Sequence, residues 1–293
     1  MTFSALAVTL VVGSALAWSG FDYARKALVA RIDPTPLMFL LTAAQTPLFA
    51  AWALADGAAW PEPRYWLPAL ASVALNVVAN LAFIHAFRIS PISLTVPLLS
   101  LTPAVTALAA VPLLGELPNR RHVAGIALVV VGAFMLHLRP GAGVSVRAML
   151  RALARERGAH LMLLVVVCWS LTPPLDKLAV EESSWPVHGT VLCGGVALAV
   201  LALLAAQGRV RAVGQVRRAP GLLGGAVLVS CLALALQLLA YGLVWVALVE
   251  TVKRGFGNLL ALAYGRFLFD EAVGRVQVVA VLLMGAGVAL ILF

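Results

Sequence analysis

The chain has 293 residues, of which 62% are hydrophobic and only 11% are charged, and its mean hydropathy is +1.01. A soluble domain of this size cannot hide so many apolar residues in one core, so a soluble fold is excluded. The formal net charge of +9 is carried largely by loop residues beside apolar stretches. We attribute it to membrane topology rather than to a nucleic-acid partner.

Apolar stretches long enough to cross ~30 Å of hydrocarbon as helices recur along the whole chain. A backbone exposed to lipid must satisfy its own hydrogen bonds, and these stretches lack the alternation of barrel strands, so we expect helices. No Lys or Arg precedes the first stretch, which favours a retained helix over a cleaved secretory signal. We predict an all-α polytopic membrane protein with ten transmembrane helices, at about residues 2–24, 35–56, 66–87, 91–113, 121–138, 159–178, 186–206, 221–246, 249–269 and 274–293.

Basic residues concentrate in alternate loops between the predicted helices. The richer loops contain Arg25, Lys26, Arg31, Arg139, Arg147, Arg151, Arg155, Arg157, Arg209, Arg211, Arg217 and Arg218. The opposite loops contain Arg64, Arg120, Arg121 and Lys177. By the positive-inside rule the richer loops are cytoplasmic, which places both termini outside a plasma membrane, here the bacterial inner membrane. Three arginines of the linker recur every four positions, which favours a short helix lying on cytoplasmic lipid.

The two halves of the chain share several sequence features. Trp18-Ser19 followed by Lys26 recurs as Trp169-Ser170 followed by Lys177, and Gly115-Glu116 recurs as Asp270-Glu271, with Gly132 and Gly287 at equal distances beyond. We therefore predict two five-helix repeats, residues 1–138 and 159–293, joined by the basic linker 139–158. An odd number of helices inverts the second repeat in the membrane, as in secondary transporters, whose substrate site lies near the repeat interface.

A family resemblance becomes specific between Ser90 and Leu136, in the stretch SPISLTVPLLSLTPAVTALAAVPLLGELPNRRHVAGIALVVVGAFML. This stretch has a Ser-Pro opening, a Ser-Leu-Thr-Pro in mid-helix, a Gly-Glu closing the fourth predicted helix and a glycine-spaced fifth helix. It resembles the EamA domain of the drug/metabolite transporter superfamily, and the last residues, GRFLFDEAVGRVQVVAVLLMGAGVALILF, resemble the second copy of that domain. The resemblance implies an inverted-repeat fold, a central cavity reached alternately from each side, and small metabolites as cargo.

The charged stretch ETVKRGFGNLL, Glu250 to Leu260, interrupts an apolar region. If the preceding loop ended at Arg254, the ninth helix would be too short to span the membrane, so we expect it to begin near Val249. Glu250 then precedes Lys253 and Arg254 by the spacing at which helix side chains meet. Because one carboxylate cannot neutralise two cations, the stretch is a candidate site for an anionic substrate. A Lys-Arg pair in the ninth helix is similar to the phosphate-binding pair of plastid triose-phosphate translocators.

Other residues within the predicted helices complete the candidate substrate site. Asn76 and Asn80 are four apart, as are Gln237 and Tyr241, so each pair lies on one helix face, toward protein or a water-filled cavity. For the asparagines, hydrogen bonds between helices are an equally good explanation. The other candidates are two repeat-related tryptophans, which fit a pocket wall or helix packing, together with a lysine and an asparagine: Trp18, Trp169, Lys177 and Asn258.

The sequence predicts a transporter rather than an enzyme, because it shows no intramembrane pair of acids, nucleophile–base motif, histidine cluster or nucleotide-binding loop. We expect no cofactor, metal or nucleic-acid partner, and one chain suffices for a path, although a dimer is compatible with it. No lone carboxylate in mid-membrane indicates a proton relay, so exchange or facilitated diffusion fits as well as proton coupling.

The predicted cargo is a small polar metabolite that carries a carboxylate or phosphate and is moved by alternating access. The alternative is an exporter of amino acids or amphiphilic drugs and metabolites, in which Glu250, Lys253 and Arg254 form a structural ion pair. A flippase for lipid-linked headgroups is a more distant alternative.

Overall fold

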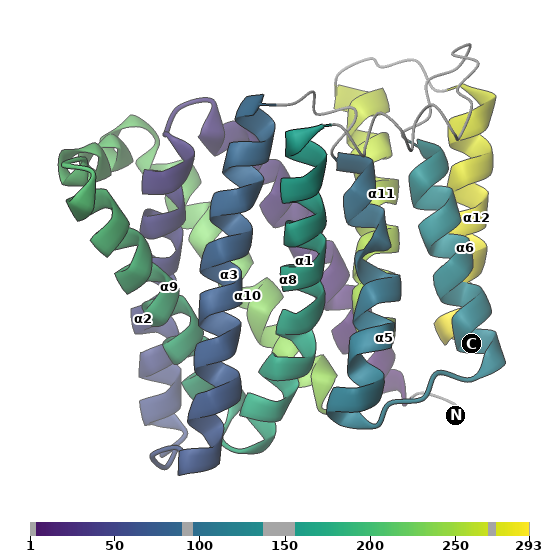
Figure 1. Ribbon diagram of the computed structural model, residues 1–293, viewed down its shortest axis with the longest axis horizontal. Coiled ribbons are helices and arrows are strands. Elements are labelled where there is room, and N and C mark those ends of the chain that lie inside the picture. The colour runs from purple at the N-terminus through teal and green to yellow at the C-terminus, as the bar shows by residue number, and fades with distance from the viewer. Residues whose placement is uncertain (1–3, 90–95, 137–155, 269–273, 293) are drawn as a thin grey trace. The chain divides into compact units, whose positions relative to one another are not determined.

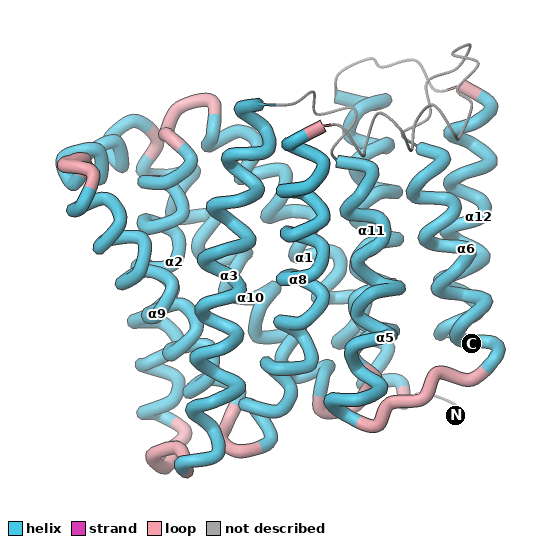
Figure 2. The backbone as a smooth tube through the Cα atoms, in the orientation of Figure 1, coloured by secondary structure: helices cyan, strands magenta, loops and turns pink. Residues whose placement is uncertain are grey.

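The computed structural model describes residues 4–89, 96–136, 156–268 and 274–292, and within them the secondary structure is helical, without a strand (Figure 1, Figure 2). The chain forms two compact units. Unit 1 comprises Met1–Ser4, Val78–Pro174 and Trp245–Phe293, and unit 2 comprises Ala5–Val77 and Leu175–Val244. Each unit thus takes helices from both halves of the sequence, and the division into repeats at 1–138 and 159–293 stays a prediction.

Unit 2 contains α1 (Ala5–Val29), α2 (Pro34–Ala55), the first part of α3 (Pro63–Ile89), the last part of α8 (Arg157–Glu181), α9 (Trp185–Ala206), the 3₁₀ helix η2 (Val210–Arg218) and α10 (Pro220–Tyr241). Helices α2, α9 and α10 each have a proline in the first turn, where its missing N–H breaks no helical hydrogen bond. Helix α2 packs against α9, and α1 packs against α10. A buried apolar core joins α1, α2 and α10 through Phe21, Leu28, Leu37, Leu41, Leu223 and Val227.

Unit 1 contains the last part of α3, the 3₁₀ helix η1 (Val96–Leu101), α5 (Thr102–Leu114), α6 (Arg120–Leu136), the first part of α8, α11 (Val246–Leu268) and α12 (Arg275–Leu292). The Gly-Glu dipeptide after α5 has a clear physical role. Gly115 has a left-handed φ of 68° and ends α5, with its N–H bound to the Val111 carbonyl. Glu116 is buried, and its Oε2 accepts the Val246 N–H at 2.8 Å, which fixes the start of α11.

Helices α6 and α12 pack side by side in unit 1 through glycines (Figure 1). A Cβ at Gly125 would lie 2.8 Å from the Gly287 carbonyl, and one at Gly132 would lie 2.7 Å from the Ala280 carbonyl. The helices are therefore antiparallel, and small residues are required for this close approach. If Gly132 and Gly287 are equivalent positions of the two repeats, then Gly125 and Ala280, each seven residues earlier, are equivalent too. A two-fold rotation would then exchange the Gly125–Gly287 contact with the Gly132–Ala280 contact. The inversion of the second repeat stays a prediction.

Seven helices of the described residues are long and apolar enough to cross a membrane, namely α1, α2, α3, α8, α9, α10 and α12. A shorter apolar helix covers Leu98–Leu114, α6 has 17 residues, and charges reduce the hydropathy of α11. The chain is thus an all-helical, multi-pass integral membrane protein. The count of ten spans and the outside location of both termini stay predictions.

Several sequence features fall outside the described residues. They are the basic surface helix with Arg139, Arg147, Arg151 and Arg155, the Ser-Pro opening at residues 90–91, and the acidic pair Asp270-Glu271. Arg157 is described, and it begins α8 as an exposed residue.

Candidate functional site

The charges of the stretch from Glu250 to Arg254 lie inside helix α11 rather than in a loop before it. The helix begins at Val246 because Glu116 binds the first amide N–H from the end of α5. The adjacent Trp245 packs edge-on against the His122 ring of α6, with centroids 5.3 Å apart. The prediction that the ninth helix includes the charged stretch is confirmed.

Glu250 and Lys253 form an ion pair within α11. The Lys253 Nζ lies 2.6 Å from the Glu250 Oε1, and the two side chains are 23% and 7% exposed, respectively. Arg254 follows on the same helix and is half-buried. The spacing argument for an internal ion pair is therefore confirmed for Lys253, while the ammonium retains partial exposure and α11 retains more cations than anions over this turn.

Gly255 and Asn258 lie on the side of α11 that faces α12. A Cβ at Gly255 would lie 2.7 Å from a methyl carbon of Val288, so this glycine allows close helix packing. The Asn258 amide Nδ2 lies 3.9 Å from the Met284 sulfur, also on α12. At 100° per residue, Glu250 and Lys253 point away from this side. The Glu250–Lys253 pair thus lies on a different face from the residues that pack α11 against α12.

The two remaining candidates of unit 1 lie near the contact of α3 with α8. The Trp169 ring lies 5.3 Å from the Phe83 ring, measured between centroids. Asn80, one turn before Phe83 on α3, is half-buried. The next residue of α8, Ser170, donates a hydrogen bond to the Thr102 carbonyl at 3.2 Å. In this structure Trp169 therefore makes a packing contact between helices.

The other predicted site residues belong to unit 2. Gln237 and Tyr241 are buried on α10, and Trp18 packs edge-on against Phe21 beside the core of α1, α2 and α10. Lys177 is half-buried near the end of α8. Asn76 donates a hydrogen bond from Nδ2 to the Ser72 carbonyl at 3.1 Å, within α3. The predicted site residues are thus divided between two units, and Glu250 and Lys253 form a direct side-chain pair.

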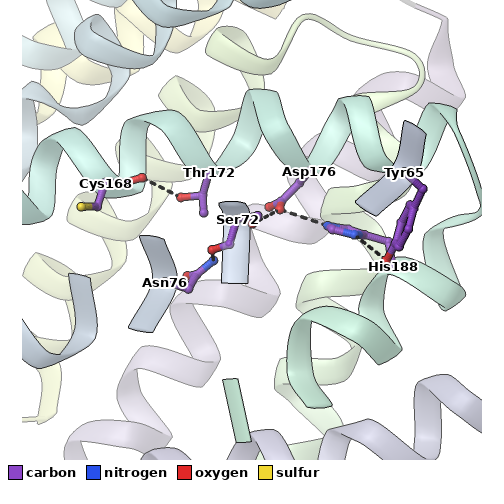
Figure 3. A network of polar contacts seen from close by, with 7 residues as sticks. All are labelled: Tyr65, Ser72, Asn76, Cys168, Thr172, Asp176 and His188. Atoms are coloured by element: carbon purple, nitrogen blue, oxygen red, sulfur yellow. Dashed lines mark hydrogen bonds and ion pairs between the residues drawn. The ribbon is translucent and has the colours of Figure 1, made fainter. Parts of the chain in front are cut away.

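A polar network that the sequence analysis did not assemble lies inside unit 2 (Figure 3). The His188 Nε2 lies 3.0 Å from the Asp176 Oδ1, and the Ser72 hydroxyl donates a hydrogen bond to the same carboxylate oxygen. The other imidazole nitrogen, Nδ1, lies 3.3 Å from the Tyr65 hydroxyl. Tyr65, Ser72 and His188 are fully buried and Asp176 is 4% exposed, so this carboxylate is held away from water by three helices.

Comparison with known proteins gives a family match over the first part of the chain. The model of the EamA-like transporter family matches residues 5–138. The chain carries an EamA domain. One solved structure, described only as the crystal structure of a protein, has the same fold, with a TM-score of 0.72, 17% identity, and coverage of 97% of this chain and 96% of its own. A comparison with curated proteins gives no match. The EamA match and the shared fold support a membrane transporter of the drug/metabolite transporter type.

The hydrogen-bond pattern of the buried network differs from that of a nucleophile–base pair. In this EamA protein the Ser72 hydroxyl binds the carboxylate of Asp176, and the His188 imidazole binds the same oxygen and Tyr65. A catalytic serine would instead donate to the imidazole. The network therefore does not have the connectivity of a hydrolytic triad.

One sequence signal points to part of this network. Helices α8 and α9 are joined by a short turn, so residues at similar distances from the turn come together in the helix hairpin. Asp176 lies five residues before the end of α8, and His188 is the fourth residue of α9. Tyr65 and Ser72 come from a helix more than a hundred positions away in the sequence, so local pattern could not have placed them.

Proposed function

We propose that this EamA protein is a secondary transporter that moves a small polar metabolite bearing a carboxylate or phosphate by alternating access. The observation that carries the proposal is the cationic turn of α11, where Lys253 and Arg254 lie inside a helix of an integral membrane protein and the Lys253 side chain is 23% exposed. Cations within a membrane-spanning segment are costly and mark substrate sites by default.

Lys253 and Arg254 supply complementary contacts to an anion. A lysine ammonium is a compact charge with three donors, and an arginine guanidinium is a planar fork that matches two oxygens of a carboxylate or phosphate. In the structure one carboxylate, that of Glu250, binds the lysine. A substrate anion would compete with Glu250 for this ammonium. We assign orientation of the substrate to Asn76, Asn80, Gln237 and Tyr241.

The ion pair also favours a second candidate function. At 2.6 Å the Glu250 carboxylate satisfies Lys253 in the absence of any ligand. A helix that compensates most of its own charge suits an exporter of amino acids or amphiphilic compounds, in which the pair is structural. The two functions differ in whether removal of the cations abolishes ligand binding.

The deciding experiment is the thermal stability of the detergent-purified protein against a panel of phosphorylated metabolites, carboxylates, amino acids and organic cations. A ligand that binds the folded state raises its apparent stability by mass action. We expect anions to raise the stability of the wild type and to have no effect on Lys253→Ala and Arg254→Ala. Arg211→Ala, which removes an exposed arginine of η2, is the matched control and should respond as the wild type does.

A stabilisation by zwitterions or amphiphilic compounds that persists in both variants would contradict the anion site. It would support the exporter with a structural ion pair.

A further inference from the structure

Asp176 and His188 form a buried acid–imidazole pair to which the proposed anion site assigns no role. The two groups lie 3.0 Å apart, with side chains that are 5% and 0% exposed, respectively. Both residues belong to apolar helices long enough to span the membrane. A carboxylate in such surroundings is stable only when it is paired with a positive charge or takes up a proton.

The contacts of the pair fit two protonation states. With a neutral imidazole, His188 donates from Nε2 to Asp176 and accepts at Nδ1 from the Tyr65 hydroxyl. Both imidazole nitrogens then have a hydrogen-bond partner, but the cluster carries one negative charge. One added proton makes the cluster neutral, as imidazolium with carboxylate or as imidazole with carboxylic acid. In the imidazolium form Nδ1 donates to the Tyr65 oxygen, so the same neighbours serve both states.

Three neighbouring helices supply no charged side chain that could replace that proton. Helices α2, α9 and α10 contain no Asp, Glu, Lys or Arg, and their titratable groups are Cys193, Cys231, Tyr241 and His188 itself. The part of α3 in unit 2 contributes Tyr65 and the exposed Arg64. On α8 itself, Lys177 is half-buried and Glu181 is exposed.

Ser72 connects this pair to a residue of the proposed substrate site. Its hydroxyl donates to Asp176, while its backbone carbonyl accepts the Asn76 side-chain N–H at 3.1 Å. Neutralising Asp176 weakens the first of these bonds, since a carboxylate accepts more strongly than a carboxylic acid. Protonation of the Asp176 carboxylate therefore acts on the turn of α3 that carries Asn76.

We propose that Asp176 and His188 form a membrane-embedded site that binds and releases one proton, and that its occupancy alters the substrate contact made by Asn76. The second part rests on the proposed function, whereas the first part does not. The site would make the transport cycle sensitive to protons through groups that never touch the substrate.

The proton site is tested without any substrate. Infrared difference spectra of the full-length protein in lipid are recorded as the pH is moved between about 5 and 8, the range in which histidines ordinarily titrate. We expect carboxyl and imidazole bands that report uptake of one proton in the wild type. Asp176→Asn should lose the carboxyl band, and His188→Gln should lose the imidazole band. His122→Gln, which replaces a buried histidine of unit 1, should keep both.

Spectra of Asp176→Asn and His188→Gln that match the wild type would overturn the proton site and leave the network as a structural tie. A second measurement addresses the link to the substrate, with the ligand panel repeated at both ends of the pH range. The apparent affinity for a bound anion, derived from its stabilising effect, should differ at least threefold between the two pH values in the wild type. It should remain constant in Asp176→Asn.

If anion affinity depends on pH equally in Asp176→Asn and in the wild type, the proposed effect of the proton site on the Asn76 contact is overturned. If no compound of the panel binds the wild type, the proposed anion transport fails, and the infrared bands still decide the proton site.

Discussion

In unit 2 the carboxylate of Asp176 is bound by side chains from two other helices, whereas in unit 1 the carboxylate of Glu250 is bound by a lysine three residues along the same helix. The first arrangement needs α3, α8 and α9 in place and lies away from water. The second needs one helical turn, and its lysine keeps partial exposure.

We expect this difference to separate a role inside the fold from a role toward a ligand. A fully buried network loses stability when one member is removed, because the remaining charge stays desolvated. A local pair with an accessible ammonium can exchange its partner for another anion at small cost. We therefore expect stability to depend on unit 2's network and ligand binding to depend on the cations of α11.

The largest effect is expected for His188→Leu. This change leaves Asp176 buried with only Ser72 as a partner, and we expect a loss of about 3–5 kcal/mol in unfolding free energy, measured by denaturant titration in mixed micelles. Replacing Asp176 by leucine in addition should recover part of the loss, since an apolar pair fills the same space without a charge. A loss for His188→Leu that is below that of Lys253→Ala would break the comparison between the units.

A second effect tests packing that involves no charge. Gly287→Ala places a Cβ 2.7 Å from the Gly125 carbonyl, so α6 and α12 must separate, and we expect a loss of about 1–3 kcal/mol. Gly285→Ala is the matched control, because a Cβ there meets nothing within 4 Å. The control should be neutral or stabilising by up to about 1 kcal/mol, since alanine favours helix. Equal losses in both variants would show that the glycine contact does not set the helix spacing.

The sequence was sufficient for features that depend on periodicity and length. Long apolar stretches predicted the membrane-spanning helices, and the length of the ninth stretch placed Glu250, Lys253 and Arg254 inside a helix, as the structure confirms. Spacing of three residues also predicted the contact of Glu250 with Lys253. These are local relations, which a single helix enforces whatever surrounds it.

Features that depend on which helices meet were not predictable in this way. Asp176 lies near the end of α8, where its carboxylate is buried against Ser72 of α3 and His188 of α9. Asn76 and Asn80 lie four apart on α3, as expected for one face, but the spacing did not show that the Asn76 amide donates to the Ser72 carbonyl beside Asp176. A sequence pattern gives the face of a helix, and the partner on that face is set by tertiary packing.

A third effect concerns the helix that carries the cations. Glu116→Ala removes the carboxylate that accepts the Val246 N–H, and we expect a loss of about 1–2 kcal/mol, since a buried amide at a helix start then lacks its charged acceptor. Glu116→Gln, which retains an acceptor oxygen, should lose less than half as much. If both variants unfold as the wild type does, water or another group replaces the carboxylate, and the start of α11 does not depend on Glu116.

The smallest stability effect and the most direct functional one are expected for Lys253→Ala. The pair with Glu250 lies within one helix and its lysine is 23% exposed, so we expect a loss of no more than about 1 kcal/mol. The same variant should lose stabilisation by anionic ligands, and both quantities can be measured on one preparation by thermal unfolding with and without each anion. Lys253→Arg keeps the charge and should retain part of the response, which separates charge from packing. A ligand-binding cation makes anion binding fall while stability is retained. A large loss of stability together with an unchanged response to anions would instead place Lys253 with Asp176 among the groups that hold the fold.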